Sequence, residues 1–491
     1  MARENVILII VDDALLDIWA RMTYLDSLPD GHWVKFSRAV VNYPVCAISR
    51  ANIFTGRRRS NLGANPPSDS PYYHGGPADS SVVGTMAHWD ANLGGEHMMP
   101  RWLQKAGYFT ACYGKYLNIY PWNKGDSYIP IGWNDWKVWL DDSGLGGSHA
   151  NHKGPGFLDY YMNINGAESH LSSADSWTSV GADDTGRQIS TDYSTDRINS
   201  MINKFLTSYL KQPFYLHIGL FAVKQPHAGS ADPLGSAQRH RATPYTPERP
   251  PSFNEADISD KSGWLNTYKP TQANLAQETA WDDDQMERWR TALAIDELVR
   301  DLITTLKVLN IYDRTCIIVT TEHSNLQGHH RLDAKGVPYE AAITTPMYVR
   351  HPDAPIGNLI SDAMVSTIDI APTFLEMAQT RPSRPMDGMS FLPLIDGRLT
   401  EPQWRQAAMF EWVNNSSVSS AIPSYKGIRT HDYKYIEFEA LGVNPASVEL
   451  YDLSGVITSP ADTDEMVNQA NNPLYAAVKA DLAQQLEKLR T

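Results

Sequence analysis

The chain has 491 residues, with 42 Lys and Arg against 56 Asp and Glu, so its formal net charge is −14. This acidic balance excludes a basic nucleic-acid-binding protein as the default class, and no nucleic acid is expected as a partner. Hydrophobic residues make up 42% of the chain and charged residues 20%, which is typical of a folded protein with a large core and not of a disordered one.

The apolar runs are short and alternate with amphipathic stretches, which predicts an α/β fold with a mainly parallel sheet covered on both faces. Four runs end in ionisable residues: residues 5–11 precede Asp12 and Asp13, residues 108–113 precede Gly114 and Lys115, residues 214–223 precede Lys224 and His227, and residues 315–321 precede Glu322 and His323. Because ligands bind at the carboxyl ends of the strands in open α/β sheets, these groups are predicted to share one site.

Helical periodicity is clear in two long stretches. Apolar residues recur at three- and four-residue intervals in residues 291–307 and 368–379, which are predicted to be outer helices. Residues 118–190 are rich in Trp, Tyr, Gly and Asn without a helical period. This composition fits either a glycan-facing loop or an aromatic core patch.

The composition of the chain and the length of its apolar runs change at about residue 383. Pro-rich sequence and short strand-like pieces then precede a closing helix at residues 473–489. We therefore predict two units: an α/β domain at residues 1–382 and a small α+β subdomain at residues 383–491.

The apolar run at residues 6–11 is cut off by two aspartates. It can therefore form neither a signal-peptide core nor a membrane span, so we expect no signal peptide and no membrane span. The three cysteines, Cys46, Cys112 and Cys316, are too few for a disulfide framework. A reducing compartment suits them, so the expected location is the cytoplasm or a larger assembly. Cys112 and Cys316 lie in apolar runs and are expected in the core.

The most informative segment is residues 43–57, in which Cys46 is followed four residues later by Arg50 at the start of a predicted helix. A helix N-terminus and a nearby cation both stabilise an anion. The alternative is a buried structural cysteine beside a surface arginine. The segment alone does not decide between them.

Here the sequence resembles the sulfatase family of the alkaline phosphatase superfamily, whose Cys-x-Pro-Ser-Arg signature contains a cysteine that is oxidised to formylglycine. The resemblance continues in order along the chain, at residues 5–13, 113–118, 335–340, 367–373 and 449–453. Within the family, the N-acetylglucosamine-6-sulfatases and heparan-sulfate 6-O-sulfatases are most similar. The resemblance implies a large mixed, mainly parallel sheet sandwiched by helices, a catalytic domain at residues 1–382 and the small C-terminal subdomain.

The resemblance also implies a set of site residues. Cys46 is the formylglycine precursor, Arg50 holds the oxygens of its hydrate, and Lys115 and Lys335 bind the sulfate. His227 is a proton donor or sulfate contact, and substrate binding also extends to Lys224 and His330. One divalent metal ion is expected, held by Asp12, Asp13, Glu322 and His323. The family resemblance implies Ca²⁺, whereas the imidazole of His323 suits Mn²⁺ or Zn²⁺.

Four positions depart from the family pattern. Ile48 stands where the signature has proline or alanine, and Glu322-His323-Ser324 replaces the common Asp-Asn-Gly. Lys224 occupies the place of the first histidine in Ala-Pro-His-x-Pro-His, and His329 replaces the glutamate of Gly-Glu-His. Together these changes indicate altered or lost chemistry around one site.

Three hypotheses about function follow. The first is a metal-dependent sulfuric ester hydrolase acting on a sulfated saccharide through a formylglycine made from Cys46. The second is a catalytically degenerate sulfatase-fold protein that binds glycan or serves as a structural component, with protein partners in an assembly. The third, suggested by His323, is a phosphoester or phosphonate hydrolase of the same superfamily.

Overall fold

The computed structural model describes residues 3–62, 95–118, 120–121, 125–140, 156–158, 160–171, 180–182, 188–190, 193–208, 212–223, 235–333, 335–414 and 419–490. Its main feature is a ten-stranded sheet with the order β12-β2-β11-β10-β1-β9-β3-β4-β5-β6. The strands are β1 (Asn5–Val11), β2 (Trp33–Val40), β3 (Phe109–Gly114), β4 (Asp135–Trp139), β5 (Tyr160–Ile164), β6 (Ala167–Leu171), β9 (Phe214–Leu220), β10 (Thr315–Thr321), β11 (Thr344–Arg350) and β12 (Leu359–Ser361). A separate two-stranded ribbon joins β7 (Val180–Ala182) and β8 (Gln188–Ser190).

The centre of this sheet is parallel and its outer parts are mixed. Strand β1 pairs in parallel with both β9 and β10, and β3 pairs in parallel with β9 and β4. Strand β11 runs antiparallel to β10 and β2, and β5 runs antiparallel to β4 and β6. The prediction of a large mixed, mainly parallel sheet is therefore confirmed.

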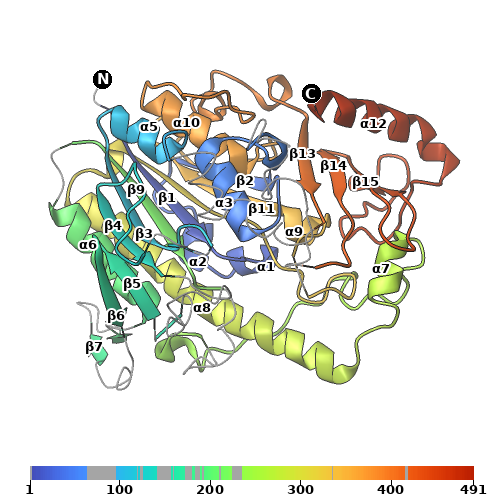
Figure 1. Ribbon diagram of the computed structural model, residues 1–491, viewed down its shortest axis with the longest axis horizontal. Helices are drawn as coiled ribbons and strands as arrows, with labels where there is room; N and C mark the ends of the chain where they lie inside the picture. Colours follow the sequence, from blue (N-terminus) through green and yellow to red (C-terminus); the bar gives the residue numbers. More distant parts are fainter. Residues whose placement is uncertain are drawn as a thin grey trace.

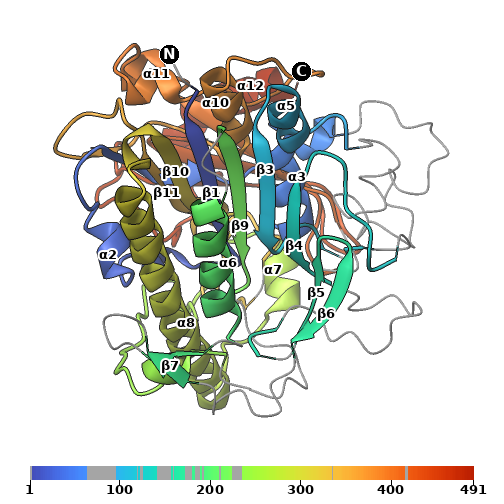
Figure 2. The same ribbon diagram turned by 90° about the vertical axis from the view of Figure 1, so that its left-hand side faces the viewer.

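Helices cover both faces of the sheet (Figure 1). They are α1 (Leu16–Trp19), α2 (Thr23–Asp26), α3 (Cys46–Thr55), α5 (Met99–Lys105), α6 (Ser194–Ser208), α7 (Gly263–Tyr268), α8 (Leu275–Val308), α9 (Glu340–Ile343), α10 (Ile370–Met377), α11 (Leu392–Ile395) and α12 (Ala476–Arg490). Figure 2 shows α6 and α8 side by side in front of β1 and β9, with α3 and α5 behind. Alternate residues of β1 accordingly belong to two different cores, Leu8 to the core with α3 and Ile9 to the core with α8. A strand buried on both faces explains why β1 is apolar throughout.

The helix predicted at residues 291–307 is only the C-terminal half of α8, which begins at Leu275. The side chain of Asn274 caps this start by accepting a hydrogen bond from the Gln277 amide at 3.0 Å. The N-terminal half, which extends away from the sheet toward α7 (Figure 1), is polar on most of its surface. It therefore lacks the apolar stripe on which the sequence prediction depended.

The C-terminal part contains a four-stranded antiparallel sheet of β13 (Ala407–Trp412), β14 (Tyr425–Thr430), β15 (Tyr433–Phe438) and β16 (Ser447–Asp452), covered by α12. Successive residues along β13 face two different cores. Met409 packs in the core with Leu482 of α12, whereas Phe410 and Trp412 belong to the core of the large sheet. The small α+β subdomain is thus present and tightly packed on the main body. The division at residues 382 and 383 stays a prediction.

The aromatic cluster of residues 118–190 is partly explained. Trp133 and Trp136 lie in the main core, with ring centroids 5.7 Å apart, and Trp133 stacks on Tyr215. These two residues therefore fit the core interpretation, whereas Trp122 lies outside the described residues. Cys112 and Cys316 are buried free thiols in β3 and β10, as expected. Among the described helices, none is both long enough and apolar enough to cross a membrane.

Candidate active site

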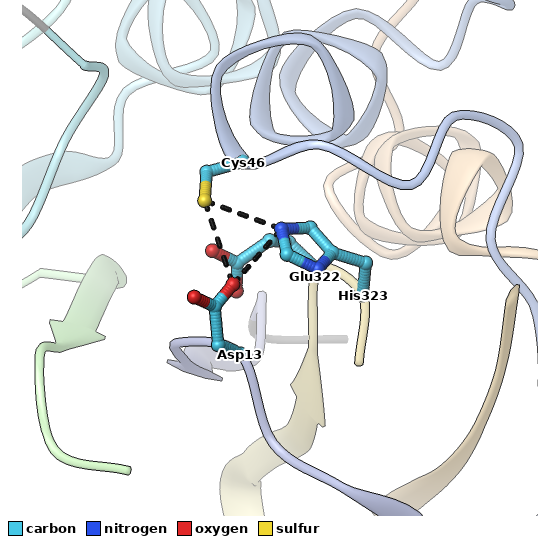
Figure 3. Close-up of side chains that lie close together, drawn as sticks. All are labelled: Asp13, Cys46, Glu322 and His323. Atoms are coloured by element: carbon cyan, nitrogen blue, oxygen red, sulfur yellow. Dashed lines mark hydrogen bonds and ion pairs between the residues drawn. The ribbon is translucent and has the colours of Figure 1, made fainter. Parts of the chain in front are cut away.

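Cys46 is the first residue of α3, and its side chain faces the carboxyl ends of the central strands (Figure 3). Val45 precedes it in an extended conformation, and the helix ends at Gly56, where a φ of 65° requires the left-handed region. Cys46 is only 1% exposed. The predicted placement of this cysteine at a helix N-terminus is what the structure shows.

Two parallel neighbours, β1 and β10, deliver the acidic groups and the imidazole. Their register pairs Val11 with Thr321, so the residues that follow each strand emerge at the same edge. Asp13 adopts a positive φ of 56°, which aspartate tolerates better than most residues. This turn directs its carboxylate toward His323 and Cys46 (Figure 3).

Three of the side chains form a compact triangle of donor atoms. His323 Nε2 lies 3.2 Å from Cys46 Sγ and 3.1 Å from Asp13 Oδ1, and Cys46 Sγ lies 3.6 Å from Asp13 Oδ1. With a carboxylate oxygen of Glu322, these donors all lie within 4.8 Å of one another, and all four residues are buried. Such a set of oxygen, nitrogen and sulfur donors can hold a divalent metal ion.

Three cations surround the acidic groups. Arg50 Nε and Nη2 both lie 3.2 Å from Glu322 Oε1, and Lys115 Nζ lies 2.7 Å from Asp12 Oδ2. Lys335 Nζ lies 2.9 Å from both oxygens of Asp13 and 3.0 Å from Cys46 Sγ. The structure thus brings together cations and acids from five segments of the chain, at residues 12–13, 50, 115, 322 and 335.

Burial and charge act in opposite directions on these groups. Burial lowers the pKa of Lys335, but the nearby negative charges, that of Asp13 foremost, together outweigh it and raise that pKa above its ordinary value. The same balance, with Asp12 as the partner, raises the pKa of Lys115. Burial lowers the pKa of His323, which favours the neutral imidazole that binds metals. The site is therefore equipped both to hold a metal ion and to neutralise an anionic substrate.

The C-terminal subdomain positions Lys335. The next residue, Gly336, has a φ of 83°, and a Cβ built there would come within 2.9 Å of the Trp412 ring. Its carbonyl accepts a hydrogen bond from the Tyr425 hydroxyl at 3.2 Å, and its amide donates to the Pro44 carbonyl at 3.1 Å. Two aromatic residues of β13 and β14 therefore fix the lysine loop against the segment that precedes Cys46.

Not every predicted residue joins this cluster. His330 is buried in a second group, where its Nδ1 lies 2.6 Å from Glu255 Oε2 and its ring lies 4.2 Å from that of Tyr339. Its contact with substrate stays a prediction. Lys224 and His227 lie outside the described residues.

A cavity of about 560 Å³ lies between α1, α8 and the segment of Glu248 and Arg249, and most of its lining was not predicted. The polar residues that line it are Asp17, Glu248, Arg249, Gln285 and His329. Asp17 lies on α1, four residues after Asp13, but Asp13 precedes the helix, so the spacing alone did not indicate a shared face. Gln285, in the polar half of α8, carried no signal either.

These features define an α/β protein with a buried group of metal donors and cations at the carboxyl edge of its main sheet, and the comparisons identify its family. The Sulfatase family model matches residues 4–380, and the model described as N-sulphoglucosamine sulphohydrolase, C-terminal, matches residues 328–491. The chain therefore belongs to the sulfatase family.

Similar curated proteins include N-acetylglucosamine-6-sulfatases and longer extracellular sulfatases. The N-acetylglucosamine-6-sulfatase of Homo sapiens is 27% identical over 422 residues, which cover 84% of this chain and 67% of that protein. The extracellular sulfatase SULF-1 homolog of Drosophila melanogaster is 26% identical over 418 residues, 83% of this chain and 33% of that protein. The chain spans about half the length, or less, of the first curated relatives it matches, 49% of a Caenorhabditis elegans Sulf-1 homolog among them.

Solved structures share the fold at low sequence identity. A protein in complex with its substrate D-glucosamine-2-N,6-O-disulfate superposes with a TM-score of 0.72 at 21% identity, over 99% of this chain and 97% of that one. The phosphonate monoester hydrolase of Agrobacterium radiobacter gives a TM-score of 0.66 at 18% identity, over 99% of this chain and 95% of that one. Both likenesses show the fold.

Proposed function

We propose that this chain is a metal-dependent sulfuric ester hydrolase that acts on a sulfated saccharide, with Cys46 as the formylglycine precursor. The observation that carries the proposal is the position of Cys46, whose sulfur lies between Lys335 and the metal-donor group of Asp13 and His323. A buried side chain at a helix N-terminus with a cation in contact is suited to attack an anionic ester.

Several side chains have separate roles in such a reaction. Formylglycine supplies a nucleophilic hydroxyl group when hydrated, and a divalent ion neutralises negative charge beside it. Lys335 and Lys115 bind the sulfuryl oxygens, and Arg50 keeps the Glu322 carboxylate in place. We retain His227 in the proposal as the proton donor to the leaving alcohol.

The proposal is tested by weighing the tryptic peptide of residues 39–50 from the native source. Formylglycine at position 46 is the expected result, and hydrolysis of a nitrophenyl sulfate should accompany it. An unmodified thiol, with no sulfate ester cleaved in the presence of Ca²⁺, Mn²⁺ or Zn²⁺, would instead support the hypothesis of a catalytically degenerate binding or structural component. Ile48 makes this measurement decisive, because it replaces the proline or alanine of the family signature.

We propose further that the metal is Zn²⁺ or Mn²⁺ and not Ca²⁺. Two nitrogen or oxygen donors of a tetrahedral site with bonds of about 2.0–2.2 Å lie about 3.3–3.6 Å apart. This is close to the 3.1 Å between His323 Nε2 and Asp13 Oδ1, two donors that remain when Cys46 is converted to formylglycine. Calcium prefers shells of six to eight oxygens, to which an imidazole contributes poorly.

The His323→Asp variant is therefore expected to shift the metal preference. Its affinity for Zn²⁺ should fall by about 10–100-fold, whereas its affinity for Ca²⁺ should rise, because an oxygen replaces the nitrogen donor. Metal bound after dialysis, measured by plasma mass spectrometry, checks this directly. The His170→Asp variant is the control, since His170 is exposed on β6 at the edge of the sheet. Equal Zn²⁺ content in the three proteins would reject His323 as a ligand.

A second candidate function is phosphoester or phosphonate hydrolysis, which the same observation of an imidazole donor favours. Phosphoryl and sulfuryl groups need similar clamps of metal and cations. Nitrophenyl phosphate and phenyl phosphonate esters assayed with Mn²⁺ or Zn²⁺ test it, and turnover faster than that of the sulfate would replace the first proposal.

The cellular location is also a proposal. All three cysteines are free and buried, which fits the cytoplasm or an assembly kept in a reducing environment. Cell fractionation tests it: protein found in the extracellular fraction would reject this location. Protein partners in an assembly would appear as co-purifying chains in the same experiment.

A further inference from the structure

Lys335 lies on a loop without regular secondary structure. The loop covers residues 335–339 and ends where α9 begins at Glu340. Its own helix or sheet hydrogen bonds therefore cannot fix Lys335 Nζ, which lies 2.9 Å from Asp13 and 3.0 Å from Cys46 Sγ. The contacts that hold the backbone of this loop must also set the position of the ammonium group.

A buried lysine of the C-terminal subdomain contacts the far end of the loop. Lys434 lies on β15 and its side chain is 0% exposed. Its Nζ donates to the Pro338 carbonyl at 2.8 Å, pairs with Glu465 and lies 3.5 Å from Glu340 Oε1. An ammonium group has three donors and no acceptor. Its three oxygen partners therefore match its number of donors.

The carboxyl group of Glu465 contacts the same segment at a second point. Glu465 is 1% exposed, and its Oε2 accepts a hydrogen bond from the amide of Glu340 at 2.6 Å. The pair of Lys434 and Glu465 thus binds one backbone carbonyl and one backbone amide of the segment that follows Lys335. Because both contacts are to the backbone, they fix the path of the chain and not only the direction of a side chain.

The charge of Glu340 adds to this group. Arg429 Nη2 lies 3.2 Å from Glu340 Oε2. Burial raises the pKa of Glu340, but the charges of Arg429 and then of Lys434 outweigh it and lower that pKa to about 2. Two buried cations of the subdomain, Arg429 and Lys434, therefore face the ionised carboxylate at the start of α9.

A purely structural contact would not require these charges. Replacing a buried ion pair by well-packed apolar residues is often neutral or stabilising. Apolar contacts are already present at the same boundary, where a Cβ on Gly336 would come within 2.9 Å of the Trp412 ring and Trp412 lies 5.3 Å from the ring of Tyr43. Hydrogen bonds are directional, whereas apolar contacts are not. The pair of Lys434 and Glu465 therefore adds a defined placement of the backbone that packing alone does not give.

We propose that Lys434, together with Glu465, is a positioning residue that keeps Lys335 Nζ in place beside Cys46 and Asp13. The pair acts only through the backbone between Lys335 and Glu340. A displacement of a binding group by about 1 Å can cost about 10²-fold in rate. This inference rests on the proposed function, since it concerns the lysine that binds the sulfuryl group, and it makes the C-terminal subdomain a part of the active site.

A double-mutant cycle tests the proposal. Lys434→Met should lower kcat/KM for a nitrophenyl sulfate by about 10–100-fold in the native protein. In a Lys335→Met background it should cost no more than about twofold, because the lysine through which it acts is gone. Lys35→Met is the matched control: Lys35 pairs with Asp26 near the beginning of β2. It should leave kcat/KM within about twofold in both backgrounds.

A paired variant keeps the test possible should Lys434→Met fail to fold. Lys434→Met combined with Glu465→Leu removes both partners, so no unpaired charge stays buried. We expect this variant to melt near the temperature of the native protein and still to lose about tenfold or more in kcat/KM. Activity restored together with stability would show that the pair has only a structural role.

Binding of inorganic sulfate, measured by calorimetry in the presence of Mn²⁺, separates the two proposals. If no ester is cleaved but Lys434→Met weakens sulfate binding as much as Lys335→Met does, and Lys35→Met does not, the proposed function fails and the positioning role stands. If esters are cleaved and Lys434→Met has no effect, or has the same effect in both backgrounds, the positioning role is overturned and the hydrolase proposal stands. If no ester is cleaved and Lys434→Met leaves sulfate binding unchanged, both fail.

Discussion

The Cys46→Ala variant is expected to hydrolyse sulfate esters at least about 10⁴-fold more slowly than the matured protein, because loss of a covalent nucleophile leaves only substrate binding and charge stabilisation. The structural reason is that Cys46 occupies the point where the cations and the metal donors meet, with its sulfur 3.0 Å from Lys335 Nζ and 3.2 Å from His323 Nε2. The loss should appear in kcat, measured with a nitrophenyl sulfate at saturating metal.

A second free cysteine provides the control for this experiment. Cys316 is equally buried but lies at the far end of β10, six residues before Glu322, which is about 20 Å along an extended strand. Cys316→Ala should leave kcat within about twofold and lower only the stability, by about 1 kcal/mol, since a small buried group is lost. If Cys46→Ala retained turnover of the sulfate ester, the assignment of Cys46 as the source of the nucleophile would be wrong.

The Arg50→Met variant is expected to lower the free energy of unfolding by about 3–5 kcal/mol, because it leaves a buried carboxylate without its counterion. Arg50 is 1% exposed and Glu322 is fully buried, with two nitrogens of the guanidinium 3.2 Å from the same carboxylate oxygen. Methionine keeps much of the side-chain volume, so the loss reports charge and hydrogen bonding more than packing. Urea unfolding in the presence of EDTA measures this loss without a contribution from bound metal.

An exposed arginine with two acidic partners is the matched control for this loss. Arg398 pairs with Glu376 and Asp396, but its side chain is 55% exposed. Arg398→Met should change the stability by no more than about 1 kcal/mol. Adding Glu322→Gln to Arg50→Met should restore part of the lost stability, since the unpaired charge is then removed. If Arg50→Met and Arg398→Met lowered the free energy of unfolding equally, the buried ion pair would contribute no more to stability than the exposed one.

Several features of the protein were predictable because they leave a local pattern in the sequence. The apolar run of residues 5–11 and the run of residues 315–321 each end in two ionisable residues. Ligands bind at the carboxyl ends of parallel strands, so Asp13 and His323 could be expected to meet. The helix that starts at Cys46 and the strands of the subdomain also follow from the spacing of apolar residues and from the turn residues that bound each element.

Other features depended on contacts between segments far apart in the sequence. Lys335 meets Cys46 across 289 positions, held by the aromatic residues of β13 and β14 that pack beside Gly336. His330 pairs with Glu255, a partner that its neighbours in the sequence do not indicate. Such pairings have no period in the sequence, because they depend on how elements pack and not on what each element is.

The sequence by itself determined the family, the main sheet and the group of ionisable residues at its carboxyl edge. Only the tertiary structure decided which cations pair with which carboxylates, and only it revealed the cavity lined by Asp17 and Gln285. The polar half of α8 that lines this cavity has no apolar stripe to mark it. Secondary structure is recorded in the spacing of residues along one segment, whereas a binding cavity forms from single residues of several segments that share no common pattern.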